Sequence, residues 1–84
     1  MTRVIFRKCK KYGEIIALFP DCINQHTNNV MAYMRLGQHF ECDYNYTVQT
    51  SYLATENEYT PLYEELKSIG YDDLKIVKRN NKQV

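Results

Sequence analysis

The stretch TENEYTPLYEELKSIG, residues 55–70, is the strongest helix signal in the chain. Thr55 followed by Glu58 matches a capping box, in which the two side chains satisfy the first free backbone N–H groups of a helix. Apolar residues then recur at the spacing of one helix face: Tyr59, Leu62, Tyr63, Leu66 and Ile69. Gly70 is a natural residue to end such a helix. A single apolar helix face must be covered, and the rest of the chain offers strands to cover it.

Pro61 conflicts with a straight helix from Thr55, because it lies past the first turn and has no N–H to donate. We expect a short first turn, a bend near Pro61 and a regular helix to Ile69. As an alternative, Thr60 and Pro61 form a second N-cap and N1 pair.

Five segments rich in β-branched and aromatic residues are expected to be strands: 3–9, 14–19, 30–36, 46–53 and 73–79. The first two form a hairpin around Gly13, and the second is apolar on both faces and therefore central. Pro20 is expected to end that second strand, because proline cannot donate to a ladder. Gly37 is expected to break or bend the third.

The order β-β-β-β-α-β predicts an α+β fold, with a mostly antiparallel sheet of about five strands and one helix packed on one face. Residues 1–79 are expected to form a single domain, and residues 80–84 a flexible C-terminal tail.

Early charges, the lengths of apolar runs and the cysteine content indicate the cellular compartment. The early charges argue against a signal peptide, and no run approaches the roughly 20 apolar residues of a membrane helix. An odd number of cysteines, three, argues against a closed disulfide framework, so reduced thiols in a cytoplasm are expected. We expect no membrane partner and no cofactor.

Basic residues concentrate at the two ends of the chain, around an acidic middle, although the net charge is only +1. If the ends lie side by side, they form a basic side made of Arg3, Arg7, Lys8, Lys10, Lys11, Lys75, Lys78 and Arg79. Such a side can attract nucleic acid, with Tyr12, Tyr33, Tyr44 and Tyr46 offering stacking faces. The alternative is a solvated strand edge, where lysines discourage edge-to-edge pairing.

Three stretches resemble a family of small proteins encoded by phages, prophages and conjugative elements of gut bacteria: VIFRKCKKYGEIIALFP (4–20), GQHFECDYNY (37–46) and ATENEYTPLYEELKSIGYDDLKIVKR (54–79). The resemblance implies a mobile-element origin and the cytoplasm of a bacterial host. It implies no particular activity. Phe40 stands where the family pattern has a small residue, and the positions of Cys22 and Cys42 are usually not cysteine there.

Two groups of reactive residues could carry chemistry, and each also has a simpler structural role. Cys22, His26, His39 and Cys42 are a weak candidate zinc set, against loop histidines and small buried thiols. Cys42 with a histidine and Asp43 has the letters of a nucleophilic triad, but adjacency in sequence does not establish one. We therefore expect no metal and no enzymatic activity.

By elimination, we expect a small non-enzymatic binding module that modulates or inhibits a host factor by binding a protein or small ligand. The alternative is a nucleic-acid-binding accessory protein that uses the basic side. The expected binding residues are Gln38, His39, Tyr44 and Tyr46. In the simpler interpretation, Gln38 and His39 only satisfy backbone groups at a strand end. The expected partner is a host or element-encoded protein, and exposed strand edges offer a route to a homodimer.

Overall fold

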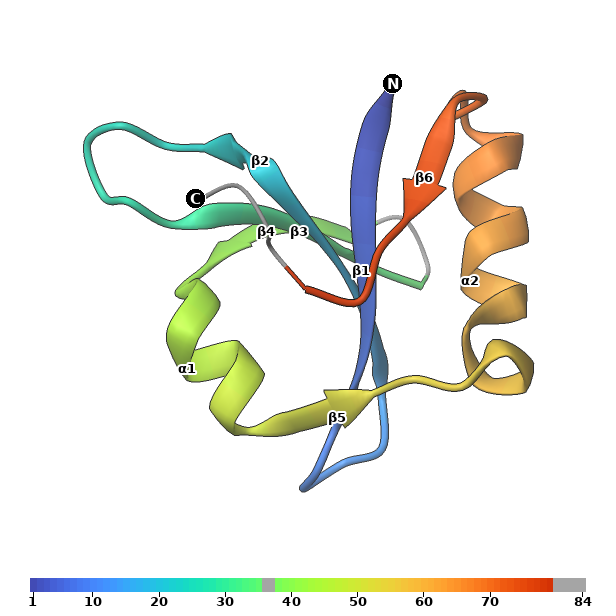
Figure 1. The fold of residues 1–84 in the computed structure, drawn as a ribbon, viewed down its shortest axis with the longest axis horizontal. Coiled ribbons are helices and arrows are strands. Elements are labelled where there is room, and N and C mark those ends of the chain that lie inside the picture. The colour runs from blue at the N-terminus through green and yellow to red at the C-terminus, as the bar shows by residue number, and fades with distance from the viewer. Residues whose placement is uncertain (36–37, 80–84) are drawn as a thin grey trace.

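The computed structural model describes residues 1–35 and 38–79, and within them the predicted α+β class is confirmed. The elements in chain order are β1 (Thr2–Cys9), β2 (Ile15–Ile23), β3 (Val30–Met34), β4 (Gln38–Cys42), α1 (Tyr44–Gln49), β5 (Ser51–Leu53), α2 (Glu56–Ser68) and β6 (Leu74–Ile76). The six strands form one mostly antiparallel sheet, and the two helices lie on opposite sides of it (Figure 1).

The sheet is an antiparallel meander in the order β4-β3-β2-β1, with β2 in the interior as predicted. The free edge of β1 is shared by two short strands. β5 pairs antiparallel with the end of β1 at Arg7–Cys9, and β6 pairs parallel with its beginning at Thr2–Val4. The two basic ends of the chain therefore do lie side by side, with Arg3 opposite Lys75.

Each face of the sheet carries its own core. On the α2 side, the fully or nearly buried residues are Val4, Phe6, Ala17, Phe19, Tyr33, Leu62 and Leu66. On the α1 side they are Ile5, Leu18, Val30 and Ala32, with Phe40, Cys42, Tyr44 and Val77 packed against them. Alternate residues of β1, β2 and β3 thus point to opposite cores, which is why the middle of β1 (Val4–Phe6) and of β2 (Ala17–Phe19) is apolar at successive positions.

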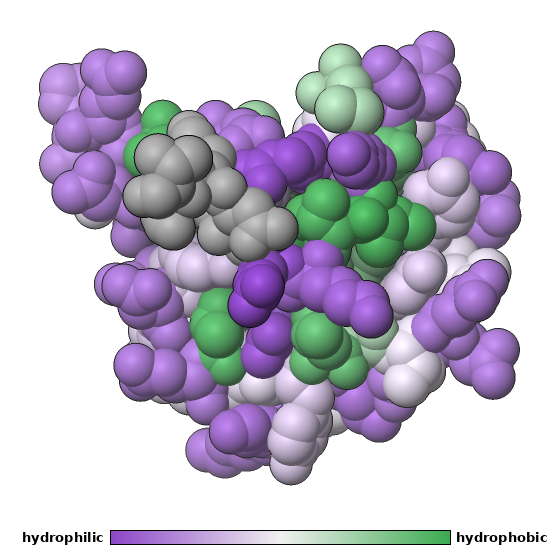
Figure 2. Space-filling model, in the orientation of Figure 1, coloured by the Kyte–Doolittle hydropathy of each residue, from purple (hydrophilic) through white to green (hydrophobic). Residues whose placement is uncertain are grey.

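The expected end of the second strand at Pro20 is wrong, because β2 continues to Ile23. The register with β3 shifts between Phe19 and Ile23, and Pro20 lies within this irregularity. At a bulge the missing proline N–H costs no ladder hydrogen bond. The ribbon of β2 and β3 projects from the body and is mostly hydrophilic at its tip (Figures 1 and 2).

The expected strand over residues 46–53 is also wrong. Residues 44–49 form α1 and only residues 51–53 form a strand. Asp43 is the N-cap, and its carboxylate accepts from the Tyr46 N–H at 3.0 Å. At the other end, the Arg7 guanidinium donates to the carbonyls of Val48 (3.1 Å) and Ser51 (2.6 Å). Arg7, more than forty positions away in the sequence, therefore stabilises the C-terminal end of α1. This tertiary contact outweighs the preference of the segment for a strand.

The helix predicted from the capping box is confirmed as α2. Thr55 accepts from the Glu58 N–H, and the Glu58 carboxylate accepts from the Thr55 N–H at 2.9 Å. The helix is continuous across Pro61, so the alternative start at Thr60 is not adopted. At its end, Tyr71 N–H donates to Leu66 and Gly70 N–H to Lys67, the two bonds of a Schellman motif with Gly70 at φ +118°.

β4 was not predicted as a separate strand, and it makes the sheet larger by one strand than expected. The predicted bend at Gly37 and the predicted tail at 80–84 lie outside the described residues. Neither of the two helices in residues 1–35 and 38–79 has the length and apolar character needed to cross a bilayer.

Candidate functional site

The four residues expected to bind a partner do not form one site. Gln38 and His39 lie on β4, whereas Tyr44 and Tyr46 lie on α1. His39 belongs to the α2 side, because its ring packs edge-on against Tyr33 at 4.7 Å. Tyr44 packs against the core of the opposite face. The structure describes the backbone of Gln38, which pairs with Met34, but not its side chain.

His39 is part of an aromatic cluster that fixes the loop after α2 to the sheet. Its Nε2 lies 2.9 Å from the hydroxyl of Tyr71, whose ring stacks on Phe19 at 5.2 Å. Burial raises the pKa of Tyr71, and nearby Cys22 raises it further, so the phenol stays protonated at neutral pH. These contacts are to tyrosine side chains and not to the backbone groups of the simpler interpretation.

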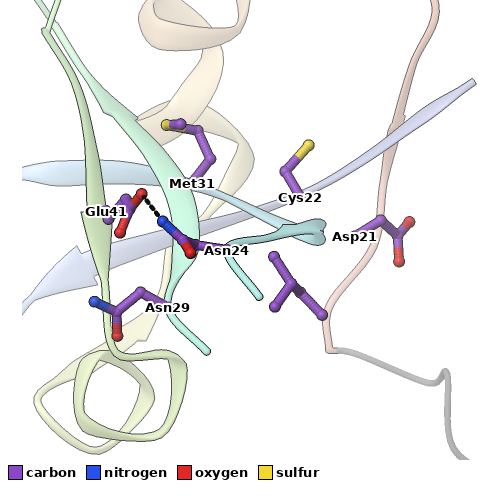
Figure 3. A pocket seen from close by; sticks show the side chains of 7 residues that line it. Asp21, Cys22, Asn24, Asn29, Met31 and Glu41 are labelled. Atoms are coloured by element: carbon purple, nitrogen blue, oxygen red, sulfur yellow. Dashed lines mark hydrogen bonds between the residues drawn. The ribbon is translucent and has the colours of Figure 1, made fainter. Parts of the chain in front are cut away.

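A polar hollow of about 380 Å³ lies on the projecting β2–β3 ribbon, lined by Asp21, Cys22, Ile23, Asn24, Asn29, Met31 and Glu41 (Figure 3). The amide of Asn24 donates to Glu41 at 2.7 Å, and the carboxylate of Asp21 pairs with Arg3. The sulfur atoms of Cys22 and Met31 point to the same side (Figure 3). Since its acidic groups already bind neighbouring side chains, this hollow is a weaker candidate for a ligand than the one described below.

The candidate zinc set does not converge. Along β4, His39 faces the α2 side, while Cys42 packs into the core on the α1 side. In the part of the chain that the structure describes, no group of three or more His, Cys, Asp or Glu side chains could hold a metal ion. Burial also raises the pKa of Cys42, which disfavours the thiolate that a nucleophile or ligand needs.

The predicted basic residues do not form one side. Lys75 lies beside the beginning of β1, whereas Lys10 and Lys11 lie in the turn beyond its end, and several of the others are bound within the molecule. Arg3 makes a two-pronged ion pair with Asp21 at 2.9 and 2.7 Å, which raises the pKa of Arg3. Arg7 is turned toward α1, and burial lowers its pKa. Lys8 pairs with Glu58 at 2.7 Å on the α2 side. The exposed residues Lys75, Lys78 and Arg79 have no ion pair among residues 1–35 and 38–79.

A second hollow, of about 460 Å³, lies between the β1–β2 turn and α1. Its lining includes Lys10, Lys11 and Tyr12 from the turn and Tyr46 from α1. Tyr52 on β5 does not line the hollow, but the Lys10 ammonium lies over its ring. We refer to these five residues as the lysine–tyrosine surface. The turn is closed by a Gly13 N–H donated to Cys9 at 2.8 Å, with Gly13 at φ +74°. This left-handed conformation favours glycine and lets the turn present three large side chains in succession.

The tyrosines of this surface are unusually open to solvent. Tyr12 is 70% exposed, Tyr46 66% and Tyr52 58%, whereas Tyr33 in the core is 1% exposed. The Lys10 ammonium lies 5.4 Å from the centre of the Tyr52 ring and 3.0 Å from the Gln49 carbonyl. The Lys11 ammonium lies 5.3 Å from the centre of the Tyr12 ring. Exposed rings beside ammonium groups offer both a stacking face and a positive charge.

None of the residues that line this hollow is acidic. Lys10 and Lys11 therefore face the hollow without a carboxylate in its lining to neutralise them. Among the residues that the structure describes, this is the place best suited to an anionic partner with planar groups. The sequence had pointed to Lys10, Lys11, Tyr12 and Tyr46 together, as parts of a larger nucleic-acid-binding side, but it had not pointed to Tyr52 or to this hollow.

Comparisons of the chain with protein-family models, with curated proteins and with solved structures found no match. Its function must therefore be argued from the geometry of its own residues.

Proposed function

We propose that the protein is a small non-enzymatic binding module, and that it holds an anionic partner at the lysine–tyrosine surface. The observation that carries this proposal is the concentration of two lysines and two open tyrosines around a hollow with no acidic lining residue. Aromatic rings with a polar end and basic groups are typical of recognition surfaces.

The non-enzymatic part of the proposal is supported by the separation of the reactive side chains. Cys42 is half-buried with a raised pKa, and His39 hydrogen-bonds Tyr71 on the other side of the sheet. A thiol and a base in these positions cannot exchange a proton directly.

We propose that the partner is a host or element-encoded factor that the module modulates or inhibits in the bacterial cytoplasm. A homodimer is a separate proposal: β4 is the last strand at one end of the sheet order, and its outer edge offers a pairing surface.

The alternative, a nucleic-acid-binding accessory protein using the whole basic side, has less support. Four of its eight residues, Arg3, Arg7, Lys8 and Lys10, are bound within the molecule. It would depend on Lys75, Lys78 and Arg79 together with the two lysines of the turn.

The experiment that tests the proposal is co-purification of the full chain from the bacterial host, with identification of bound protein, nucleic acid and small molecules. The variant Lys10→Glu/Lys11→Glu should lose the bound species, because it reverses the charge at the hollow. Lys75→Glu/Lys78→Glu makes the same change in charge elsewhere and should retain it. Nothing bound to the unmodified protein, or equal loss in both variants, would contradict the proposal.

A further inference from the structure

We propose that the lysine–tyrosine surface takes a short segment of single-stranded nucleic acid, with bases on Tyr12 and Tyr46 and phosphates on Lys10 and Lys11. This inference rests on the proposed function for the place of binding, and it assigns a single strand to that place instead of a protein factor. Stacking on aromatic rings and a positively charged track along the backbone are the two features that binders of single strands share.

The tyrosines of the protein differ in their exposure to solvent. Tyr33 is buried, and Tyr59, Tyr63 and Tyr71 pack against the core on the α2 side. By contrast, the rings of Tyr12 and Tyr46 line the hollow with about two thirds of their surface in water. A ring in that position gains little for the fold, and its open π-face can stack on any base.

The electrostatic part follows from the arrangement of charge over the molecule. The acids of α2 lie on the opposite side of the sheet from α1, so they would repel phosphate from that side (Figure 1). Lys8 is neutralised by Glu58, but Lys10 and Lys11 lie at the hollow itself. Lys10 already donates to the Gln49 carbonyl, yet an ammonium group has three protons to donate.

The size of the hollow favours unpaired bases over a duplex. A volume of about 460 Å³ is that of a small-ligand pocket, and its lining comes from the β1–β2 turn, α1 and the adjoining ends of three strands. Bases in a duplex are stacked on each other and cannot lie on a tyrosine ring without leaving the helix. Two lysines at one hollow also supply fewer phosphate contacts than the 6–10 or so of a protein that tracks duplex DNA.

The test is fluorescence anisotropy with the full chain and a labelled oligothymidine of about 12 nucleotides, within the usual site size of single-strand binders. The expected affinity is at least about tenfold higher than for a duplex of the same length, with a slope of log K against log salt near −1.4 for about two phosphates. Tyr12→Ala/Tyr46→Ala should weaken binding at least about tenfold, while Tyr12→Phe/Tyr46→Phe should stay close to the unmodified protein, because phenyl rings still stack.

Charge-matched variants locate the site. Lys10→Glu/Lys11→Glu should abolish binding and Lys75→Glu/Lys78→Glu should not. No binding of oligothymidine, equal affinity for the duplex, or equal loss in the two lysine variants would overturn the inference. Competition with thymidine monophosphate distinguishes binding of a free nucleotide from binding of a strand. If the monophosphate displaced oligothymidine at the same concentration of nucleotide units, the inference of a strand would be overturned.

A polyglutamate peptide of matched charge distinguishes failure of the single-strand inference from failure of the proposed function. If the peptide binds as tightly as oligothymidine, with the same dependence on Lys10 and Lys11, the partner is an acidic protein surface. The proposed function would then stand, and the single-strand inference would fail.

Discussion

The two helices cover opposite faces of the same sheet, and they are held there in different ways. α2 has a capping box at its start, a Schellman motif at its end and two fully buried leucines, Leu62 and Leu66. α1 has six residues, and Arg7 from β1 donates to the carbonyls at its C-terminal end. Around α2 the tyrosines pack inward, and beside α1 two of them are open to water.

This difference indicates a division between stability and recognition. On the α2 side the aromatic residues pack in the core, so substitutions there should change mainly the stability of the fold. The α1 side presents Tyr46 and the neighbouring turn to solvent, so changes there should act mainly on binding. Arg7 connects the two roles, because it supports the element that positions Tyr46.

The largest effect on stability is expected at Leu66, a fully buried residue of α2 that belongs to the core between this helix and the sheet. Leu66→Ala should lower the free energy of unfolding by about 2–5 kcal/mol, through lost apolar burial and the cavity left behind. Chemical denaturation followed by circular dichroism measures it. Leu53→Ala, the same change at a residue 43% exposed on β5, should cost less than about 1 kcal/mol. Equal losses of unfolding free energy in the two variants would contradict the burial of Leu66 in the core on the α2 side.

Removal of the Arg7 contacts should have the next largest effect. Arg7→Met should cost about 1.5–3 kcal/mol, because it removes charge-assisted hydrogen bonds to Val48 and Ser51. Hydrogen exchange should show early loss of protection in α1 with α2 still protected. Arg35→Met is the matched control, since the exposed Arg35 makes one ion pair of 3.8 Å with Glu65. Simultaneous loss of protection in both helices would show that Arg7 does not support α1 selectively.

A smaller effect is expected at the N-cap of α2. Thr55→Ala should cost about 1 kcal/mol, because it removes the side-chain acceptor for the Glu58 N–H. Thr55→Ser keeps a hydroxyl and should remain close to the unmodified protein in thermal unfolding. If serine lost as much as alanine, the cap would not depend on the hydrogen bond.

The smallest effect concerns pH. The hydrogen bond from Lys8 lowers the pKa of Glu58, and the backbone N–H of Thr55 lowers it further. A depressed pKa contributes stability above the unfolded value, near 4.5, and this contribution is lost as pH falls through the folded value. Glu58→Gln should therefore be slightly less stable than the unmodified protein at neutral pH, and the gap in unfolding midpoint should close in acid. A gap that widens in acid would reverse the sign of the linkage.

The elements that could be predicted from the sequence are those whose signals are local. Thr55 and Glu58 begin α2, Gly70 follows its end, and the apolar spacing between them gives the buried face. The first hairpin is predicted in the same way from its turn at Gly13. α1 has a local signal in Asp43, but the strand preference of the following residues masks it, and the contribution of Arg7 depends on tertiary contact.

The candidate site was predictable as residues but not as a place. Lys10 and Lys11 were identified by charge, Tyr12 as a stacking ring and Tyr46 as a binding residue. Their meeting depends on α1 being a helix, so a strand over 46–53 could not have shown it. His39 was identified as a binding residue, but its neighbours Tyr33 and Tyr71 come from distant segments and make it part of the aromatic cluster.

The most direct test of the recognition surface is a two-dimensional ¹H–¹⁵N NMR titration of the full chain with oligothymidine. The expected shifts are confined to residues 9–12 and 44–52, with α2 and the His39–Tyr71 pair unchanged. Shifts centred on α2 or β4, shifts that follow Lys75 and Lys78 instead, or no shifts at all would contradict the assignment of recognition to the α1 side.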